Sequence, residues 1–324
     1  MNVRWSLLFV SLIVAFTACQ SLVNEVDPAK LPKTDSKLVV NCYISPQDTV
    51  LAVAVAHSQP VLGVDTSGLN LVSNATVVLS DGTQSITIPY DPQQSLYVVD
   101  ARALPIVVGK TYQLQVSAGG FATVIASCTV PKEVPISSIS LDSTQGPTRP
   151  DGTQTWDYYV RALWQDPAGE TNFYRVVGAA RFTALMRGAE SATDTVQRPV
   201  VLSAAVSFGR SEQYVSDRNQ DGQTIASSRV QLPTSYSASY SYRNSDGSLT
   251  YGALNNLTLR RPLTVIVDVL HTDETYYHYH YAVQQQRSTG SNPFAEPVLV
   301  PTNVAGGLGC FAAYNRSRVT TVLR

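Results

Sequence analysis

The sequence has few charged residues and no excess of either sign. Only 15% of its 324 residues are Asp, Glu, Lys or Arg, and 23 Lys and Arg balance 24 Asp and Glu to a net charge of -1. An average soluble domain has roughly 25% charged residues. This balance argues against a nucleic-acid partner, and 44% hydrophobic residues argue against a chain that is disordered throughout.

The sequence also lacks the motifs that mark common catalytic and metal sites. It contains no Gly-x-Ser-x-Gly elbow, no His-Glu-x-x-His pair, no phosphate-binding loop and no clear pair of carboxylates. Neither a Cys-x-x-Cys pair nor a Cys/His set with zinc spacing is present. We therefore expect a protein that is not an enzyme and that carries no cofactor.

An apolar run long enough to span a membrane is missing from the N-terminus. The run from Trp5 to Ala18 follows the cationic Arg4 and is shorter than the roughly 20 residues that cross a bilayer as a helix. Small residues precede Cys19. This pattern predicts a secretory signal peptide over residues 1–18.

The ending Phe16-Thr17-Ala18-Cys19 resembles a bacterial lipoprotein box. We expect Cys19 to be acylated, because the chemistry needs small side chains beside the cleaved bond and a thiol after it. The alternative is a secreted protein cut nearby, with Cys19 incidental. Several acyl chains make a firm membrane anchor. No Asp directly follows Cys19, which favours the outer membrane and leaves the leaflet open; residues 19–36 are predicted to be a tether.

Three cysteines remain if Cys19 carries lipid. Cys42 and Cys128 lie in apolar stretches that are predicted as the first and last strands of one domain. Such strands can be neighbours in a sandwich, so two alternatives stay open: a Cys42–Cys128 disulfide or two small buried thiols. Cys310 lies in a glycine-rich run and is interpreted as a small packed residue.

Residues 37–132 show short alternating apolar segments separated by turn residues. Seven such segments at this spacing predict an immunoglobulin-like β-sandwich. Gly109 precedes the segment that contains Tyr112. We expect the Tyr112 hydroxyl to fold back onto the preceding loop, as in a tyrosine corner.

The rest of the chain is predicted to form a second β-rich domain, which makes the fold class mainly all-β. Residues 133–154 are rich in proline and are interpreted as a linker, and residues 155–324 supply further strands. One helix is expected over about residues 274–287, because Asp273 can cap its start and Gly290 can mark its end.

Three polar residues have the spacing of a calcium-binding loop. Asp217, Asn219 and Asp221 stand at alternating positions before Gly222, so their side-chain oxygens could surround one cation. The residue at the twelfth place is Ser228 instead of the expected Glu. The alternative is a plain surface turn, which uses the same residue types.

Two aromatic segments give weaker hypotheses. His278 and His280 would share a face on a strand and could bind a transition metal, but they diverge on the predicted helix. Tyr236, Tyr240 and Tyr242 share one face of a predicted strand. They could form a glycan or peptide platform, or they could fill a core.

Several motifs resemble one bacterial family over nearly the whole chain. They are the hairpin Asp166–Glu170, the Tyr276-Tyr277 helix, the segment Asn292–Pro297 and the closing segment Thr302–Tyr314. The chain is similar to Bacteroidota lipoproteins of the outer membrane catalogued as domain of unknown function four-two-four-nine. The resemblance implies an accessory role beside a TonB-dependent transporter. The glycines of the closing segment are interpreted as structural, because they permit close backbone approach.

These observations predict a lipid-anchored outer-membrane accessory or binding protein, with a TonB-dependent transporter as the expected partner. The alternative is a surface adhesin or a glycan- or peptide-binding module that uses the tyrosines of residues 236–242. A hydrolase with an unrecognised site is a third alternative.

Overall fold

The computed structural model describes residues 35–59, 70–148, 150–187, 197–243, 249–259, 261–289, 296 and 298–324. The predicted signal peptide 1–18, Cys19 and all but the last two residues of the predicted tether 19–36 lie outside these residues. Among the described residues, no helix combines the length and apolar character needed to cross a membrane.

The described chain is mostly strand, as predicted, and the expected helix runs over Glu274–Thr289. The elements are β1 (Leu38–Ile44), β2 (Val50–His57), β3 (Thr76–Ser80), β4 (Ser85–Ile88), β5 (Tyr90–Asp91), β6 (Leu96–Asp100), β7 (Thr111–Ser117), β8 (Val124–Thr129), β9 (Ile136–Thr148), β10 (Gln154–Gln165), β11 (Phe173–Arg187), β12 (Gln197–Val206), β13 (Tyr214–Ser216), β14 (Thr224–Ala226), β15 (Val230–Gln231), β16 (Ser235–Arg243), β17 (Leu249–Thr258), β18 (Leu263–Thr272), α2 (Glu274–Thr289) and β19 (Leu308–Leu323).

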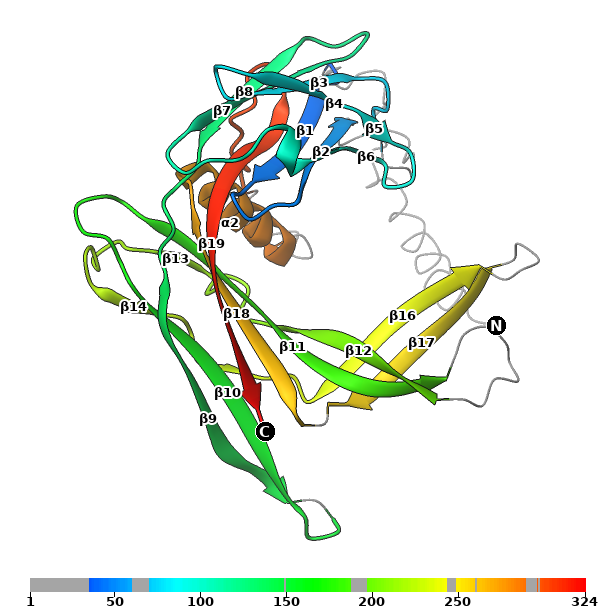
Figure 1. Ribbon diagram of the computed structural model, residues 1–324, viewed down its shortest axis with the longest axis vertical. Coiled ribbons are helices and arrows are strands. Elements are labelled where there is room, and N and C mark those ends of the chain that lie inside the picture. Colours follow the sequence, from blue (N-terminus) through cyan, green and yellow to red (C-terminus); the bar gives the residue numbers. More distant parts are fainter. Residues whose placement is uncertain are drawn as a thin grey trace, which may run out of the picture.

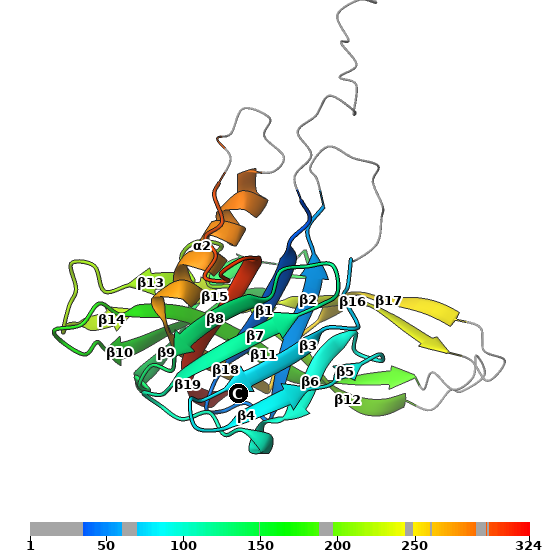
Figure 2. The ribbon, with the colours of Figure 1, turned by 90° about the horizontal axis from the view of Figure 1, so that it is seen from above.

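The N-terminal strands form the predicted sandwich. One layer contains β1, β2, β6 and β5, and the other has the order β4-β3-β7-β8 (Figure 2). Alternate residues of β1 point into the space between the layers, so Leu38, Val40, Cys42 and Ile44 are each at most 1% exposed. The period of two in the sequence therefore gives one buried face and one partly exposed face.

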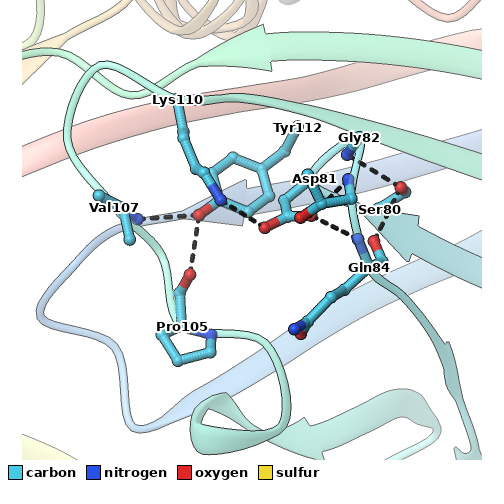
Figure 3. A network of polar contacts seen from close by, with 9 residues as sticks. Ser80, Asp81, Gly82, Gln84, Pro105, Val107, Lys110 and Tyr112 are labelled. Atoms are coloured by element: carbon cyan, nitrogen blue, oxygen red, sulfur yellow. Dashed lines mark hydrogen bonds and ion pairs between the residues drawn. The ribbon is translucent and has the colours of Figure 1, made fainter.

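The predicted tyrosine corner is present beside β7 (Figure 3). The Tyr112 hydroxyl donates to the Pro105 carbonyl oxygen at 2.8 Å and accepts the Val107 N–H at 2.9 Å. The neighbouring Lys110 ammonium lies 2.6 Å from an Asp81 carboxylate oxygen in the β3–β4 turn. These contacts join two loops at one end of the sandwich.

The C-terminal strand β19 belongs to both halves of the molecule (Figure 1). Its first residues pair in parallel with β1, and its later residues pair antiparallel with β18. The result is one nine-stranded sheet with the order β12-β11-β18-β19-β1-β2-β6-β5 and with β13 beside β11. Phe311 and Ala313 lie in the core of the sandwich. The predicted division into residues 37–132 and 155–324 therefore does not separate the sheets.

A second core lies where β10 and its neighbours pack against β11 and β18. Trp164, Tyr174 and Val267 are among its fully buried members. Helix α2 also contacts β11, β18 and β19. Nearly every residue of β18 is buried, which accounts for the apolar residues on both of its faces.

The predicted linker 133–154 is wrong over most of its length. Residues 136–148 form strand β9, which pairs antiparallel with β10. This strand has a neighbour on one side only and is largely exposed. An exposed edge strand needs few apolar residues, so its sequence resembles that of a linker.

Candidate ligand-binding groove

Two turns lie side by side where the two sheets of the second core meet. The first turn, residues 166–172, joins β10 to β11, and the second turn, residues 217–223, joins β13 to β14. Strand β10 pairs with β14, and β11 pairs with β13. Both turns therefore cross between the same two sheets, and this pairing brings them together.

Backbone N–H groups of each turn donate to carboxylates of the other. Gly222 N–H donates to Asp166 Oδ2 at 3.0 Å, and Gly169 N–H donates to Asp221 Oδ1 at 2.8 Å. Asn172 N–H donates to Asp217 Oδ2 at 2.8 Å. Gly222 has φ +68°, and a Cβ there would lie 2.7 Å from the Ala168 side chain. Glycine is therefore required for the close contact of the two turns.

Three carboxylates meet at this contact. Oxygens of Asp166, Asp217 and Asp221 all lie within 4.8 Å of one another. Asp166 and Asp217 are 2% and 4% exposed, and Asp221 is exposed. Among the described residues, no Lys or Arg nitrogen lies within 4.0 Å of any of them. The contact is a concentration of negative charge without a paired cation on the described chain.

Aromatic rings from β11 and α2 face the same space. Tyr277 and Tyr281 are one helical turn apart, with parallel rings whose centroids are 5.9 Å apart at 6°. The Phe173 ring lies 4.8 Å from that of Tyr277. Tyr214 contacts both tyrosines edge-on at 6.2 Å. The tyrosine pair is therefore packed against the rings of Phe173 and Tyr214.

The two walls enclose an open groove of about 810 Å³, which we call the aromatic groove. Volumes of about 300–1,000 Å³ are typical of ligand sites. Its lining includes Glu170, Phe173, Asp217, Asp221, Tyr277 and Tyr281. The lining thus combines aromatic rings with polar and acidic side chains, an arrangement that can hold an apolar surface and a polar or cationic group of one ligand.

A smaller cleft of about 570 Å³ lies beside the groove, at the end of the sandwich. Its buried His271 has Nδ1 at 2.7 Å from the Lys132 carbonyl oxygen and Nε2 at 3.0 Å from Asn172 Oδ1. The Asn172 amide donates to the Pro167 and Glu170 carbonyl oxygens, which fixes its orientation. Burial lowers the pKa of His271, against the opposing effect of the Lys132 carbonyl and nearby carboxylates. The His271 ring therefore lies between the end of the sandwich and the first turn.

The chain matches a known family. A family model described as a domain of unknown function, DUF4249, matches residues 24–320, which is most of the chain. The chain belongs to the DUF4249 family. A search of curated proteins finds no match to it.

In this DUF4249 protein the calcium hypothesis stays a prediction. Asp217 and Asp221 are together, as expected, and Asp166 lies beside them. Asn219 is exposed and has φ +71°, a conformation that suits a turn. The contribution of Asp166 depends on the pairing of β10 with β14, which local spacing does not reveal.

The predicted tyrosine platform is only partly within the described residues. Strand β16 contains Tyr236, Tyr240 and Tyr242, but the structure does not describe the side chains of Tyr240 and Tyr242. Tyr236 is partly buried and packs edge-on against Phe182 at 5.7 Å. The core-filling alternative therefore holds for Tyr236.

Of the two alternatives for Cys42 and Cys128, the structure has the pair of buried thiols and not the disulfide. Cys42, Cys128 and Cys310 are all free and buried. Cys42 lies on β1 between Phe311 and Val53, whereas Cys128 lies on β8 in the opposite layer. The two strands face each other across the core instead of pairing, and burial raises the pKa of both thiols.

The two candidate histidines have separate surroundings on α2. His278 is half exposed, and its Nε2 lies 3.6 Å from Glu274 Oε1. His280 packs against the Tyr43 and Tyr276 rings, with centroids 4.8 and 4.3 Å away. Burial lowers the pKa of His280 to about 4, helped by the charges of two nearby arginines. Because the segment is a helix, the strand geometry required for a shared metal does not arise.

Proposed function

We propose that this DUF4249 protein is a non-enzymatic binding protein, held at the bacterial outer membrane by lipid on Cys19, that works with a TonB-dependent transporter or its cargo. The observation that supports a binding role is the aromatic groove, whose lining contains both a tyrosine pair and carboxylates. A concave site with aromatic and polar lining of this kind is typical of ligand binding.

The bonds around the groove support binding over catalysis. Both ring nitrogens of His271 lie against structural oxygen atoms. Asp166 accepts from the Tyr174 hydroxyl and from Gly222 N–H. These groups hold the two turns in place, which is a positioning role.

The proposal is tested by purifying the tagged full-length protein from its own outer membranes in mild detergent. We expect a TonB-dependent transporter to co-purify, and we expect the Cys19→Ala variant to leave the membrane fraction. Recovery of the wild-type protein alone in repeated purifications, from membranes that contain transporters, would reject the transporter partner. Membrane retention of the Cys19→Ala variant would reject the anchor.

A further inference from the structure

We propose that the aromatic groove binds the cationic side chain of an arginine or lysine in a partner protein or peptide cargo. This inference rests on the proposed binding function and names the chemistry of the ligand. It is carried by the charge of the groove, by its aromatic wall and by the acceptor atoms that remain available.

The charge of the groove is negative. Three carboxylates line it, those of Glu170, Asp217 and Asp221, against the single guanidinium of Arg218. Lys132 approaches Glu170 only at 3.9 Å, and both side chains are largely exposed, so this pair neutralises little. Asp166 adds a fourth carboxylate behind the lining. A cationic ligand would compensate this charge, whereas a neutral ligand would leave it uncompensated.

The aromatic wall suits the same ligand. A guanidinium or ammonium group is attracted to the face of a tyrosine ring within about 6 Å of its centroid. Tyr277 and Tyr281 line the groove together with the acidic turns, and their rings are parallel. The methylene stem of an arginine or lysine can cover these rings while its charged end reaches the carboxylates.

Asp221 has an oxygen available for the ligand. Its Oδ1 accepts the Gly169 N–H, while Oδ2 has no hydrogen-bond donor among the described residues. The side chain is exposed at the lining of the groove. A guanidinium that reaches Oδ2 would form a charge-assisted hydrogen bond without displacing the bond that joins the two turns.

The test measures binding of short peptides to the purified full-length protein by calorimetry. The probes are acetyl-Gly-Gly-Arg-Gly-Gly-amide, the same peptide with neutral citrulline in place of arginine, cellotetraose and calcium chloride. We expect saturable binding of the arginine peptide and binding of the citrulline peptide at least about tenfold weaker. Equal binding of the two peptides would overturn the proposal, as would binding of cellotetraose or calcium without binding of the arginine peptide.

Two variants assign the binding to the groove. Asp221→Asn removes the charge and keeps an oxygen for Gly169 N–H, and Tyr281→Leu keeps apolar volume but removes the ring. We expect each variant to bind the arginine peptide about tenfold more weakly, while its thermal unfolding midpoint stays close to that of wild type. Asp91→Asn changes a partly buried carboxylate of the sandwich that does not line the groove, and it should leave binding unchanged. Undiminished binding to Asp221→Asn would overturn the proposal even if Tyr281→Leu failed to fold.

The co-purification experiment separates this inference from the proposed function. If the protein binds the arginine peptide but no transporter co-purifies with it, the transporter partner is rejected and the proposed ligand of the groove is retained. If a transporter co-purifies equally with wild type and with Asp221→Asn, and no peptide binds, the transporter partner is retained and the proposed ligand of the groove is rejected.

Discussion

A single carboxylate joins the helix to the C-terminal strand. Asp273 Oδ1 accepts the Tyr276 N–H at 2.7 Å, and Oδ2 accepts the Ala313 N–H at 2.7 Å. The Asp273 N–H in turn donates to the Ala313 carbonyl oxygen. The residue was expected only as a helix cap, because the sequence around it shows the helix start but not the strand that lies against it.

Asp273 predicts a pH-dependent stability. Burial raises its pKa from 3.8 to about 6, against the lowering effect of its two backbone hydrogen bonds. Between these values the folded state binds more protons than the unfolded state, so the free energy of unfolding falls as pH rises from about 4 to 6. The loss from this group is at most about 3 kcal/mol. Urea unfolding at several pH values measures it.

The Asp273→Asn variant isolates this effect from the other titrating groups. Asn stays neutral and can still accept the Tyr276 N–H. We expect the variant to gain stability relative to wild type as pH rises through the same window. A difference between the two proteins that did not change with pH would mean that Asp273 titrates at its ordinary pKa.

At the scale of elements, the pairing of β1 with β19 depends on backbone contact. Gly309 lies opposite Val40 in the parallel ladder and has φ +106°. A Cβ at this position would lie 2.1 Å from the Val40 carbonyl oxygen. Because the obstructing atom belongs to the backbone of the paired strand, it can move only if the pairing changes.

The Gly309→Ala substitution should therefore destabilise the protein strongly. We expect a loss of about 3 kcal/mol or more in the free energy of unfolding, from the left-handed backbone together with the steric overlap. Gly119→Ala is the matched control, since a Cβ there meets nothing within 4 Å. It should change stability by less than about 1 kcal/mol. Chemical denaturation of both variants measures the difference, and equal stability would show that β1 and β19 tolerate separation.

The sequence predicted where the strands of the sandwich lie along the chain better than it predicted which strands pair with one another. Alternation over Leu38–Ile44 is local, so it gives the strand and its buried face directly. The closing segment was interpreted as a glycine-rich packing motif, yet it begins the strand Leu308–Leu323. Strand β9 was missed because its exposed edge permits a polar sequence. The acidic contact needs Asp166 beside Asp217, and only the pairing of distant strands brings them together.

At the scale of the whole molecule, the sandwich is incomplete without the end of the chain. Removal of β19 would leave β1 with an unpaired edge and would take Phe311 from the core. Such an edge and cavity are each destabilising. The sandwich is therefore built from the N-terminal strands together with β19.

A fragment of residues 35–132 should accordingly fail to form a stable fold. We expect weak near-ultraviolet circular dichroism and no cooperative thermal transition. The same fragment joined by a flexible linker to residues 302–315 should regain both, because it recovers the β1 partner and the core residues. Cooperative unfolding of the shorter fragment would contradict the dependence on β19.

The parallel pairing of β1 with β19 also sets the order of events during synthesis. The strands at residues 38–129 emerge from the ribosome long before Leu308–Leu323, the strand that pairs with β1. Contacts so distant in sequence form slowly, since the loop they close must be ordered first. Until β19 has emerged, Leu38–Ile44 is therefore an unfinished sheet edge, and such an edge is prone to pair with other chains.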